Sequence, residues 1–178
     1  MAVVTGASRG IGRAIAVEFA RAGADVVVTA RSSESAPSKL PGTIEATARE
    51  VEALGRRSLA IPMDVTNPEQ VEEMARRTLA AFGRCDILVN NAGISSPAPF
   101  HETPLRRWDL VMNVNLRGPA MCMQAFLPHM VERHSGRIIN ISSFLAEVML
   151  PGMVSYSVSK VALEKLTQYA GEELKPYG

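Results

Sequence analysis

The sequence predicts an α/β fold, a doubly wound parallel sheet with helices on both faces. Short apolar runs of strand length alternate with stretches of helical periodicity from the first residues onward. Strands buried on both faces are almost continuously apolar, and strand–helix alternation favours parallel pairing through right-handed crossovers. The 178 residues, 47% of them hydrophobic, are enough for a single domain over residues 1–178 with a full core.

Five segments have the length and apolar character of buried strands. They are Ala2–Thr5, Ala24–Ala30, Leu59–Met63, Asp86–Asn90 and Ile138–Ser142. The third contains Pro62, a residue that sheets accept mainly at their edges.

The first three helices are predicted from apolar residues spaced three and four positions apart. The first helix has such residues on one face: Ile11, Ile15 and Phe19. The second is marked by Ile44, Ala48, Val51 and Leu54. The third begins at an N-cap, Asn67, followed by Pro68 and then Gln70 three residues on. Its inward face is predicted to hold Val71, Met74, Ala75, Thr78 and Phe82.

Two further helices and one loop complete the prediction. A helix opens at Thr103-Pro104 and continues towards Met130, and Pro119 predicts a kink or break near residues 115–119. The last helix covers about residues 155–174. Residues 32–43 are rich in Ser and Pro and aperiodic, which indicates a loop that is long for a strand-to-helix connection.

Charge and cysteine content exclude several classes of protein. With 19 Lys and Arg against 18 Asp and Glu, no broad field favours nucleic acid or an acidic membrane as a partner. Cys85 and Cys122 cannot form a disulfide framework, and a reducing cytoplasm fits them best. No apolar run approaches the roughly 18 residues of a membrane span. The three histidines have no ligand partners at metal-site spacing, so we expect no metal.

A glycine-rich turn follows the first predicted strand. Residues 5–12 read TGASRGIG, with glycines at 6, 10 and 12. Glycines at a strand-to-helix junction allow a tight turn and close backbone approach to a pyrophosphate, which the helix N-terminus then holds. The spacing differs from the G-x-G-x-x-G of the common dinucleotide fingerprint. The turn predicts a nucleotide site; the alternative is a glycine-rich turn without a ligand.

Tyr156 and Lys160 lie four residues apart and therefore on one face of a helix. Such a pair is also common on solvated helix faces, so by itself it indicates little. One positive charge about 4 Å from a phenolate, at an effective dielectric constant near 20, contributes about 4 kcal/mol. That matches the cost of ionising a phenol near neutral pH. Neither Tyr169 nor Tyr177 has such a partner.

Together these motifs resemble the short-chain dehydrogenase/reductase family, in its NADPH-type branch of ketoacyl-reductase-like and hydroxysteroid-dehydrogenase-like proteins. The resemblance covers the whole chain, with the motifs in family order. They are TGASRGIG at 5–12, Asp64-Val65, NNAG at 90–93, Asn115, Ser142-Ser143, and Tyr156 with Lys160. It implies a Rossmann-type sheet with strands in the order 3-2-1-4-5 and a reaction that interconverts a secondary alcohol and a ketone.

The resemblance implies four catalytic residues. Tyr156 would exchange a proton with the substrate oxygen, and Ser143 would hydrogen-bond the same oxygen. Lys160 would bind the nicotinamide ribose and support the phenolate. Asn115 would hold a water that links Lys160 to solvent. Ser142 would point to the opposite face of the strand and is expected to be a strand-end hydroxyl.

The resemblance also implies a set of cofactor contacts at the carboxyl ends of the strands. They come from Gly6, Ser8, Arg9, Gly10, Ile11, Gly12, Arg31, Asp64, Val65, Asn91, Ala92 and Gly93, joined by Tyr156 and Lys160. Asp64 would accept from the adenine amino group, and Asn90 is expected to tie adjacent strands together.

Charge at the end of the second strand favours NADP(H) over NAD(H). An NAD-specific site normally places an acid there for the ribose 2′-hydroxyl, whereas this chain has Arg31 and no acid until Glu34. Arg9 and Arg31 converging on one point would suit a 2′-phosphate. If both are solvated surface groups, the preference stays open.

The chain departs from the family pattern after Tyr156's helix. It stops at Gly178, whereas family members continue with a sixth strand, a Pro-Gly turn over the nicotinamide, a substrate lid and a seventh strand. We therefore expect a C-terminally incomplete reductase. The alternative is a non-catalytic nucleotide-binding module. A homo-oligomer could form through the helices around 104–130 and 155–174.

Overall fold

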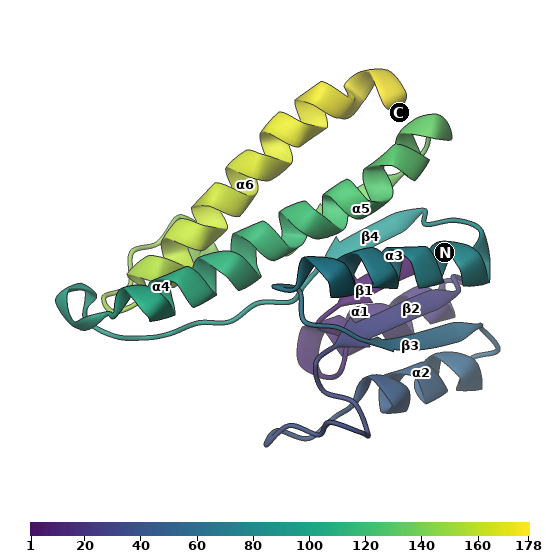
Figure 1. Ribbon diagram of the computed structural model, residues 1–178, viewed down its shortest axis with the longest axis horizontal. Coiled ribbons are helices and arrows are strands. Elements are labelled where there is room, and N and C mark those ends of the chain that lie inside the picture. Colours follow the sequence, from purple (N-terminus) through teal and green to yellow (C-terminus); the bar gives the residue numbers. More distant parts are fainter.

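The computed structural model describes residues 1–178 and confirms the predicted fold class (Figure 1). A parallel five-stranded sheet has the order β3-β2-β1-β4-β5. The predicted strand bounds differ from the observed ones by at most two residues. The strands are β1 (Ala2–Thr5), β2 (Val26–Ala30), β3 (Ser58–Pro62), β4 (Ile87–Asn90) and β5 (Arg137–Asn140).

The helices pack in two layers, one on each face of the sheet. One apolar cluster joins β1 and β2 to α1 (Gly10–Arg21) and α2 (Ile44–Ala53). The other joins the opposite face to α3 (Pro68–Phe82), α5 (Gly118–Glu132) and, at its margin, α6 (Val154–Leu174). Helix α4 (Leu105–Met112) extends beyond the sheet in Figure 1. None of the helices is both long and apolar enough to cross a membrane.

The predicted core face of α1 is wrong at its first residue. Ile11 is 66% exposed, and the fully buried positions of this helix are Gly12, Ala16 and Ala20. Ile15 only packs against the edge of the core. Small residues face the sheet because α1 starts in direct contact with the glycine turn, which leaves no room for branched side chains there.

Helix α3 begins as predicted, although one capping contact differs. The Asn67 side chain accepts a hydrogen bond from the Gln70 backbone N–H at 3.1 Å, so Asn67 is the N-cap. The Gln70 side chain accepts from the Asp64 N–H at 2.7 Å instead of closing a capping box on Asn67. This contact ties the start of α3 to the end of β3. Phe82 is only half-buried, beneath the Arg57 guanidinium.

The long helix was predicted to kink or break near residues 115–119, and the structure has one wide helical turn at this place. Residues 113–117 form one π-helical turn between α4 and α5, which places Pro119 in the first turn of α5. Pro119 has no N–H to donate to a carbonyl of the preceding turn, and the helix widens there instead of ending. Pro128 lies inside α5 without ending it.

Two predictions about smaller features also have clear outcomes. The loop at residues 32–43 contains neither helix nor strand, as predicted. Cys85 and Cys122 are buried, and burial raises the pKa of each thiol to about 12, so both remain protonated. Ser142, predicted as a strand residue, lies beyond the end of β5. The last bond to β4 runs from the Ile141 N–H to the carbonyl of Asn90, the final residue of β4, at 3.0 Å.

Candidate functional site

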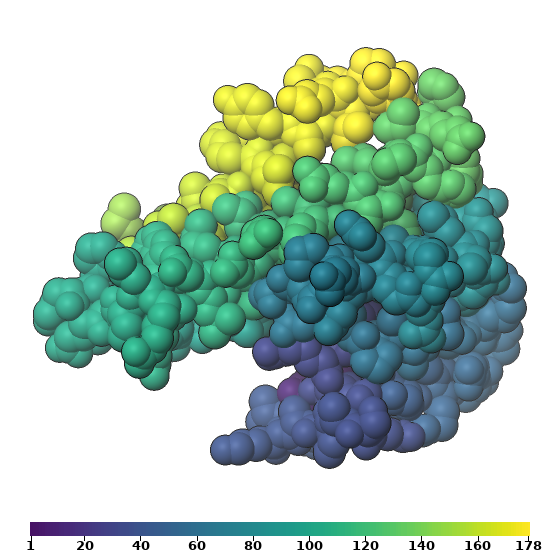
Figure 2. Space-filling view, viewed as in Figure 1, coloured from purple at the N-terminus to yellow at the C-terminus, as the bar shows by residue number.

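The strand ends predicted to bind a nucleotide form one cavity. It has a volume of about 420 Å³ and is lined by residues that follow β1, β2, β3 and β4. Figure 2 shows the molecular surface indented between the projecting α4 region and the blue tip formed by residues around 32–43. In open parallel sheets, ligands bind outside the carboxyl ends of the strands where the strand order reverses, here between β1 and β4.

Close packing explains the glycines of the turn after β1. A Cβ atom on Gly12 would lie 2.4 Å from the Gly6 carbonyl oxygen and from Asn91 Nδ2. Gly6 has φ +67°, and a Cβ there would lie 2.9 Å from the Ala92 Cα. Since real Cβ atoms do not approach so closely, only glycine lets this turn, α1 and the segment after β4 meet.

The N-terminus of α1 has no side-chain cap, unlike its neighbours. Thr43 and Asn67 cap α2 and α3 by accepting backbone N–H groups, whereas Arg9, the N-cap of α1, makes no such bond. The first N–H groups of α1 therefore keep their donor capacity. No atom lies within 4 Å of the position that a Cβ on Gly10 would take. Such a helix start suits a phosphate group.

The segment after β4 is bonded to the turn after β1. Asn91 Nδ2 donates to the carbonyl oxygens of Thr5 (2.9 Å) and Gly6 (3.2 Å). Thr5 Oγ1 accepts from the N–H groups of Asn91 and Ala92 at 3.0 and 3.1 Å. Asn90 Nδ2 donates to Asn140 Oδ1 at 2.8 Å, so Asn90 joins β4 to β5 as predicted. Asn91 thus positions the backbone, and it lines the cavity together with Ala92 and Gly93.

Asp64 and Val65 form the wall that follows β3. Asp64 Oδ1 accepts from the Thr66 N–H and hydroxyl at 2.9 and 2.8 Å, which orients the carboxylate. Its other oxygen lies 3.9 Å from Arg31 Nη1. Val65 is buried against Gly118, where a Cβ would come within 3.0 Å of the valine.

The two predicted arginines line the same cavity. Arg31 is exposed and pairs only loosely with Asp64. Arg9 makes no salt bridge, and its Nη2 donates to Ser32 Oγ at 2.9 Å. Glu34, the first acid after β2, is held by Arg49 at 2.8 Å and is not among the lining residues. The cavity therefore has two cationic groups near the end of β2 and no acid from that segment.

Lys160 brings α6 to the wall of the cavity. Its buried Nζ donates to the Ile141 carbonyl at 2.7 Å and lies 5.7 Å from the centre of the Tyr156 ring. Nζ would be 3.7 Å from a Cβ on Gly93, so the lysine reaches the segment that lines the cavity. Burial lowers the pKa of the Lys160 ammonium.

Tyr156 and Ser143 keep free hydrogen-bonding capacity. The Tyr156 side chain is half-buried, and its hydroxyl makes no hydrogen bond in the structure. Ser143 caps the short 3₁₀ turn at residues 144–146, where its Oγ accepts from the Leu145 N–H at 3.2 Å. The Ser143 hydroxyl proton is therefore available to a third group. Ser142 Oγ instead donates to Glu164 Oε1, which ties it to α6.

Asn115 is fully buried in the π turn, and all its contacts are structural. Oδ1 accepts from the Ile94 N–H, and Nδ2 donates to the Ile94 carbonyl, both at 2.9 Å. Nδ2 also donates to Ser159 Oγ at 3.0 Å, and Ser159 Oγ donates to the Tyr156 carbonyl at 2.6 Å. The side chain does not bond Lys160; it joins the β4 segment to the first turns of α6.

Ser159 is the one member of this network that sequence reasoning missed. It is completely buried between Asn115 and the backbone of Tyr156. The available signal was its position three residues after Tyr156, which places both on one side of the helix.

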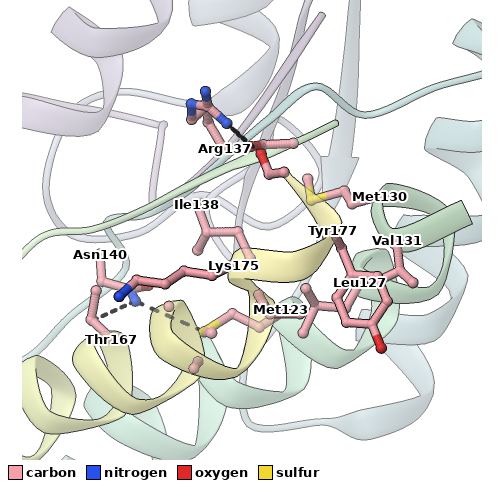
Figure 3. Close-up of a pocket in the computed structure, with 15 residues that line it drawn as sticks. Met123, Leu127, Met130, Val131, Arg137, Ile138, Asn140, Thr167, Lys175 and Tyr177 are labelled. Atoms are coloured by element: carbon pink, nitrogen blue, oxygen red, sulfur yellow. Dashed lines mark hydrogen bonds between the residues drawn. The ribbon is translucent and has the colours of Figure 1, made fainter. Parts of the chain in front are cut away.

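A second cavity lies away from every predicted site residue. It has a volume of about 380 Å³ and is formed by α5, β5 and the C-terminal half of α6 (Figure 3). Met123, Leu127 and Met130 line it, and Asn140 Nδ2 donates across it to Thr167 Oγ1 at 2.8 Å. Two cationic side chains also line it, but Arg137 Nη1 donates to the Gly136 and Gly178 carbonyls, and Lys175 pairs with Glu172.

Comparison with known proteins agrees with the site's geometry. A family model described as short chain dehydrogenase matches residues 1–178. The chain is 37% identical over 177 residues to 3-oxoacyl-[acyl-carrier-protein] reductase FabG of Staphylococcus epidermidis, covering 99% of this chain and 70% of that protein. It is 37% identical over 174 residues to hydroxysteroid dehydrogenase-like protein 2 of Bos taurus, covering 97% of this chain and 41% of that protein.

Solved structures match equally closely. A metagenomic short-chain oxidoreductase in complex with NADP superposes with a TM-score of 0.90 at 40% identity, over 99% of this chain and 76% of that one. Acetoin dehydrogenase from Enterobacter cloacae gives a TM-score of 0.89 at 37% identity, over 99% of this chain and 68% of that one.

Proposed function

Because the chain belongs to the short-chain dehydrogenase family, we propose that it is an NADP(H)-dependent oxidoreductase that interconverts a small-molecule ketone and a secondary alcohol. One observation carries the proposal. Lys160, one helical turn after Tyr156, reaches to within 3.7 Å of the Cβ position of Gly93, which lines the cavity at the strand ends. A cofactor held in that cavity would therefore extend towards the Tyr156 hydroxyl.

The residues around the cavity fit a dinucleotide. The turn after β1 leaves no space for a side chain at Gly12, and the start of α1 keeps uncapped N–H donors for a pyrophosphate. Asp64, oriented by Thr66, offers a carboxylate oxygen to an adenine amino group. Lys160 is placed to donate to a ribose hydroxyl at the other end.

The proton chemistry belongs to Tyr156 and Ser143. A reduced nicotinamide, when bound, supplies a hydride to the carbonyl carbon. Tyr156 gives its phenolic proton to the carbonyl oxygen as that hydride arrives, and the product is the secondary alcohol. Ser143 donates its free hydroxyl proton as a hydrogen bond to the same oxygen and holds it in place. In the opposite direction Tyr156, as phenolate, accepts the alcohol proton, and the Lys160 ammonium stabilises that charge.

Asn115 and Ser159 position this machinery. Their hydrogen bonds join Ile94, after β4, to the Tyr156 carbonyl on α6. Because both side chains are completely buried, the distance between the cavity wall and Tyr156's helix is set by these contacts.

Four observations support NADP(H) as the preferred cofactor. Arg9 and Arg31 both line the cavity near the end of β2. Arg9 has no carboxylate partner, so a 2′-phosphate would supply its counter-charge. Glu34 is engaged by Arg49 and does not compete for that place. The solved metagenomic relative is a complex with NADP.

The proposal is tested by NADPH oxidation with a panel of ketones and quinones, comparing wild type with Tyr156→Phe. We expect turnover by the wild type and a loss of at least about a hundredfold in Tyr156→Phe, since the variant keeps the ring but has no proton to give. NADPH affinity, measured by cofactor fluorescence, should remain within about twofold of wild type.

Tyr169→Phe is the matched control, because Tyr169 lies on the same helix, is 71% exposed and does not line the cavity. Its turnover should equal that of wild type. If Tyr156→Phe turns over as fast as wild type, Tyr156 is not the acid. If wild type binds NADPH but reduces nothing in the panel, the chain is a nucleotide-binding module without chemistry.

A further inference from the structure

The loop between β2 and α2 folds back onto the cofactor cavity. Its two ends are joined by a hydrogen bond from the Ile44 N–H to the Ser32 carbonyl at 3.1 Å. Near its end Gly42 has φ +106°, and a Cβ there would lie 2.4 Å from the Ser8 carbonyl oxygen. The loop therefore packs directly on the turn that follows β1, at the border of the surface indentation in Figure 2.

The Arg9 side chain contacts this loop, and no acidic side chain compensates its positive charge. Its Nη2 donates to Ser32 Oγ at 2.9 Å, Ser38 Oγ at 2.6 Å and the Gly42 carbonyl at 3.3 Å. All three acceptors are uncharged, and Arg9 Nε is buried without any partner. A guanidinium held by neutral oxygens keeps its capacity for a charge-assisted pair with an anion.

Ser38 links Arg9 to its own loop. Its hydroxyl donates to the Leu40 carbonyl at 2.9 Å and accepts from the Leu40 N–H at 3.1 Å as well as from Arg9. One donation and two acceptances use the whole capacity of a serine hydroxyl. The orientation of the Arg9 guanidinium and the position of Leu40 are therefore coupled through one atom.

Leu40 lines the cavity although it is 63% exposed. The same cavity is lined by Asp64 and Val65, the residues proposed to face the adenine. A ligand between them would cover an apolar side chain that is otherwise in water, which is favourable for an aromatic base.

From these contacts we propose that Leu40 and Ser38 are cofactor-specificity residues: Leu40 packs on the adenosine, and Ser38 holds Arg9 towards the 2′-phosphate. The proposal rests on the NADP(H)-binding function proposed above. It assigns the two residues separable effects. Leu40 contacts a part shared by NADP⁺ and NAD⁺, whereas Ser38 acts through Arg9 on the phosphate that only NADP⁺ has.

The test is calorimetric titration of the 178-residue chain with NADP⁺ and with NAD⁺, for wild type, Leu40→Ala, Ser38→Ala and Ser35→Ala. We expect Leu40→Ala to weaken both cofactors by about fivefold, because apolar contact area is lost. Ser38→Ala should weaken NADP⁺ by about tenfold and NAD⁺ by less than twofold, because a hydrogen bond to a charged group is removed.

Ser35→Ala is the control, since Ser35 lies in the same loop, bonds only Ser33 and does not line the cavity. It should leave both affinities unchanged, and equal unfolding midpoints without cofactor establish that all four proteins are folded. If wild type prefers NADP⁺ while Leu40→Ala and Ser38→Ala bind both cofactors as wild type does, the loop assignment is overturned and the proposed function stands. If wild type binds neither cofactor, the proposed function falls as well.

Discussion

The two halves of the cleft are built differently. The glycine-turn half, comprising the turns after β1 and β4, is held together by glycines in close contact and by four hydrogen bonds that Asn91 and Ala92 donate to Thr5 and Gly6. The Tyr156 half, comprising residues 143–160, presents hydroxyls that make few bonds beside apolar side chains in water. Met149 is 96% exposed and Phe144 is 71% exposed.

This difference separates binding from chemistry. In the glycine-turn half, hydrogen bonds between the turns after β1 and β4 fix the backbone, so its shape exists before any ligand arrives. In the Tyr156 half the Ser143 and Tyr156 hydroxyls remain free to bond a substrate oxygen. The apolar side chains around them are exposed and available for contact with another molecule. Tyr156→Phe, described above, tests the second half and should have the largest effect on turnover. The following substitutions test the first half and the lysine that joins the two.

Gly12→Ala should break the glycine-turn half. Its Cβ would lie 2.4 Å from the Gly6 carbonyl, so the turn must move, and we expect a loss of about 3 kcal/mol in the free energy of unfolding together with loss of NADP⁺ binding. Urea unfolding and calorimetry measure the two effects. Gly171→Ala, near the C-terminal end of α6 with no atom within 4 Å of its Cβ position, should instead stabilise by about 0.5–1 kcal/mol. Equal behaviour of the two variants would contradict the close-packing argument.

Arg31→Ala should change cofactor preference without changing the fold. We expect NADP⁺ affinity to fall about tenfold and NAD⁺ affinity to stay within twofold, because a cation near the 2′-position is lost. The ratio of the two dissociation constants is the measurement. Arg21→Ala is the matched control, since Arg21 pairs only with Glu18 on the outer end of α1. A ratio unchanged in Arg31→Ala would show that Arg31 is a solvated surface group.

The smallest expected effect is the contribution of Lys160 to the free energy of unfolding, which depends on pH. Its burial lowers the pKa of the ammonium in the folded chain below that of an unfolded lysine. Between those two pKa values the unfolded chain binds more protons, so the Lys160 contribution to stability rises as pH increases towards the unfolded value of about 10.4. Urea unfolding of wild type and Lys160→Met between pH 7.5 and 10.5 isolates the Lys160 contribution to stability. Wild type should gain stability relative to the variant with rising pH; a constant difference would contradict the effect of burial.

Features that depend on residues close together in the sequence were predictable. The strand–helix alternation, the N-cap at Asn67, the break before Pro119 and the loop at 32–43 all follow from patterns within a few positions. The glycines of the turn after β1 were identified for the same reason. The role of Asn90 in joining adjacent strands was expected from the family resemblance, and its side chain does join β4 to β5.

Contacts between distant segments were decided only by the tertiary structure. Ile11 is exposed because α1 meets Gly6 and Asn91 with its glycine face. Gln70 bonds Asp64 rather than closing a capping box, and Ser159 is buried because Asn115, 44 positions earlier, needs an acceptor. Ser38 and Leu40 show the same effect, since a Ser/Pro-rich loop carries no signal that it will fold onto Arg9. The sequence by itself therefore determined the elements and the chemical groups at their ends, because these depend on local backbone preferences and periodicity. Tertiary packing decided which of those groups bond one another and which remain free for a ligand. Hydrogen-bond partners that are far apart in the chain come together only when the helices pack on the sheet.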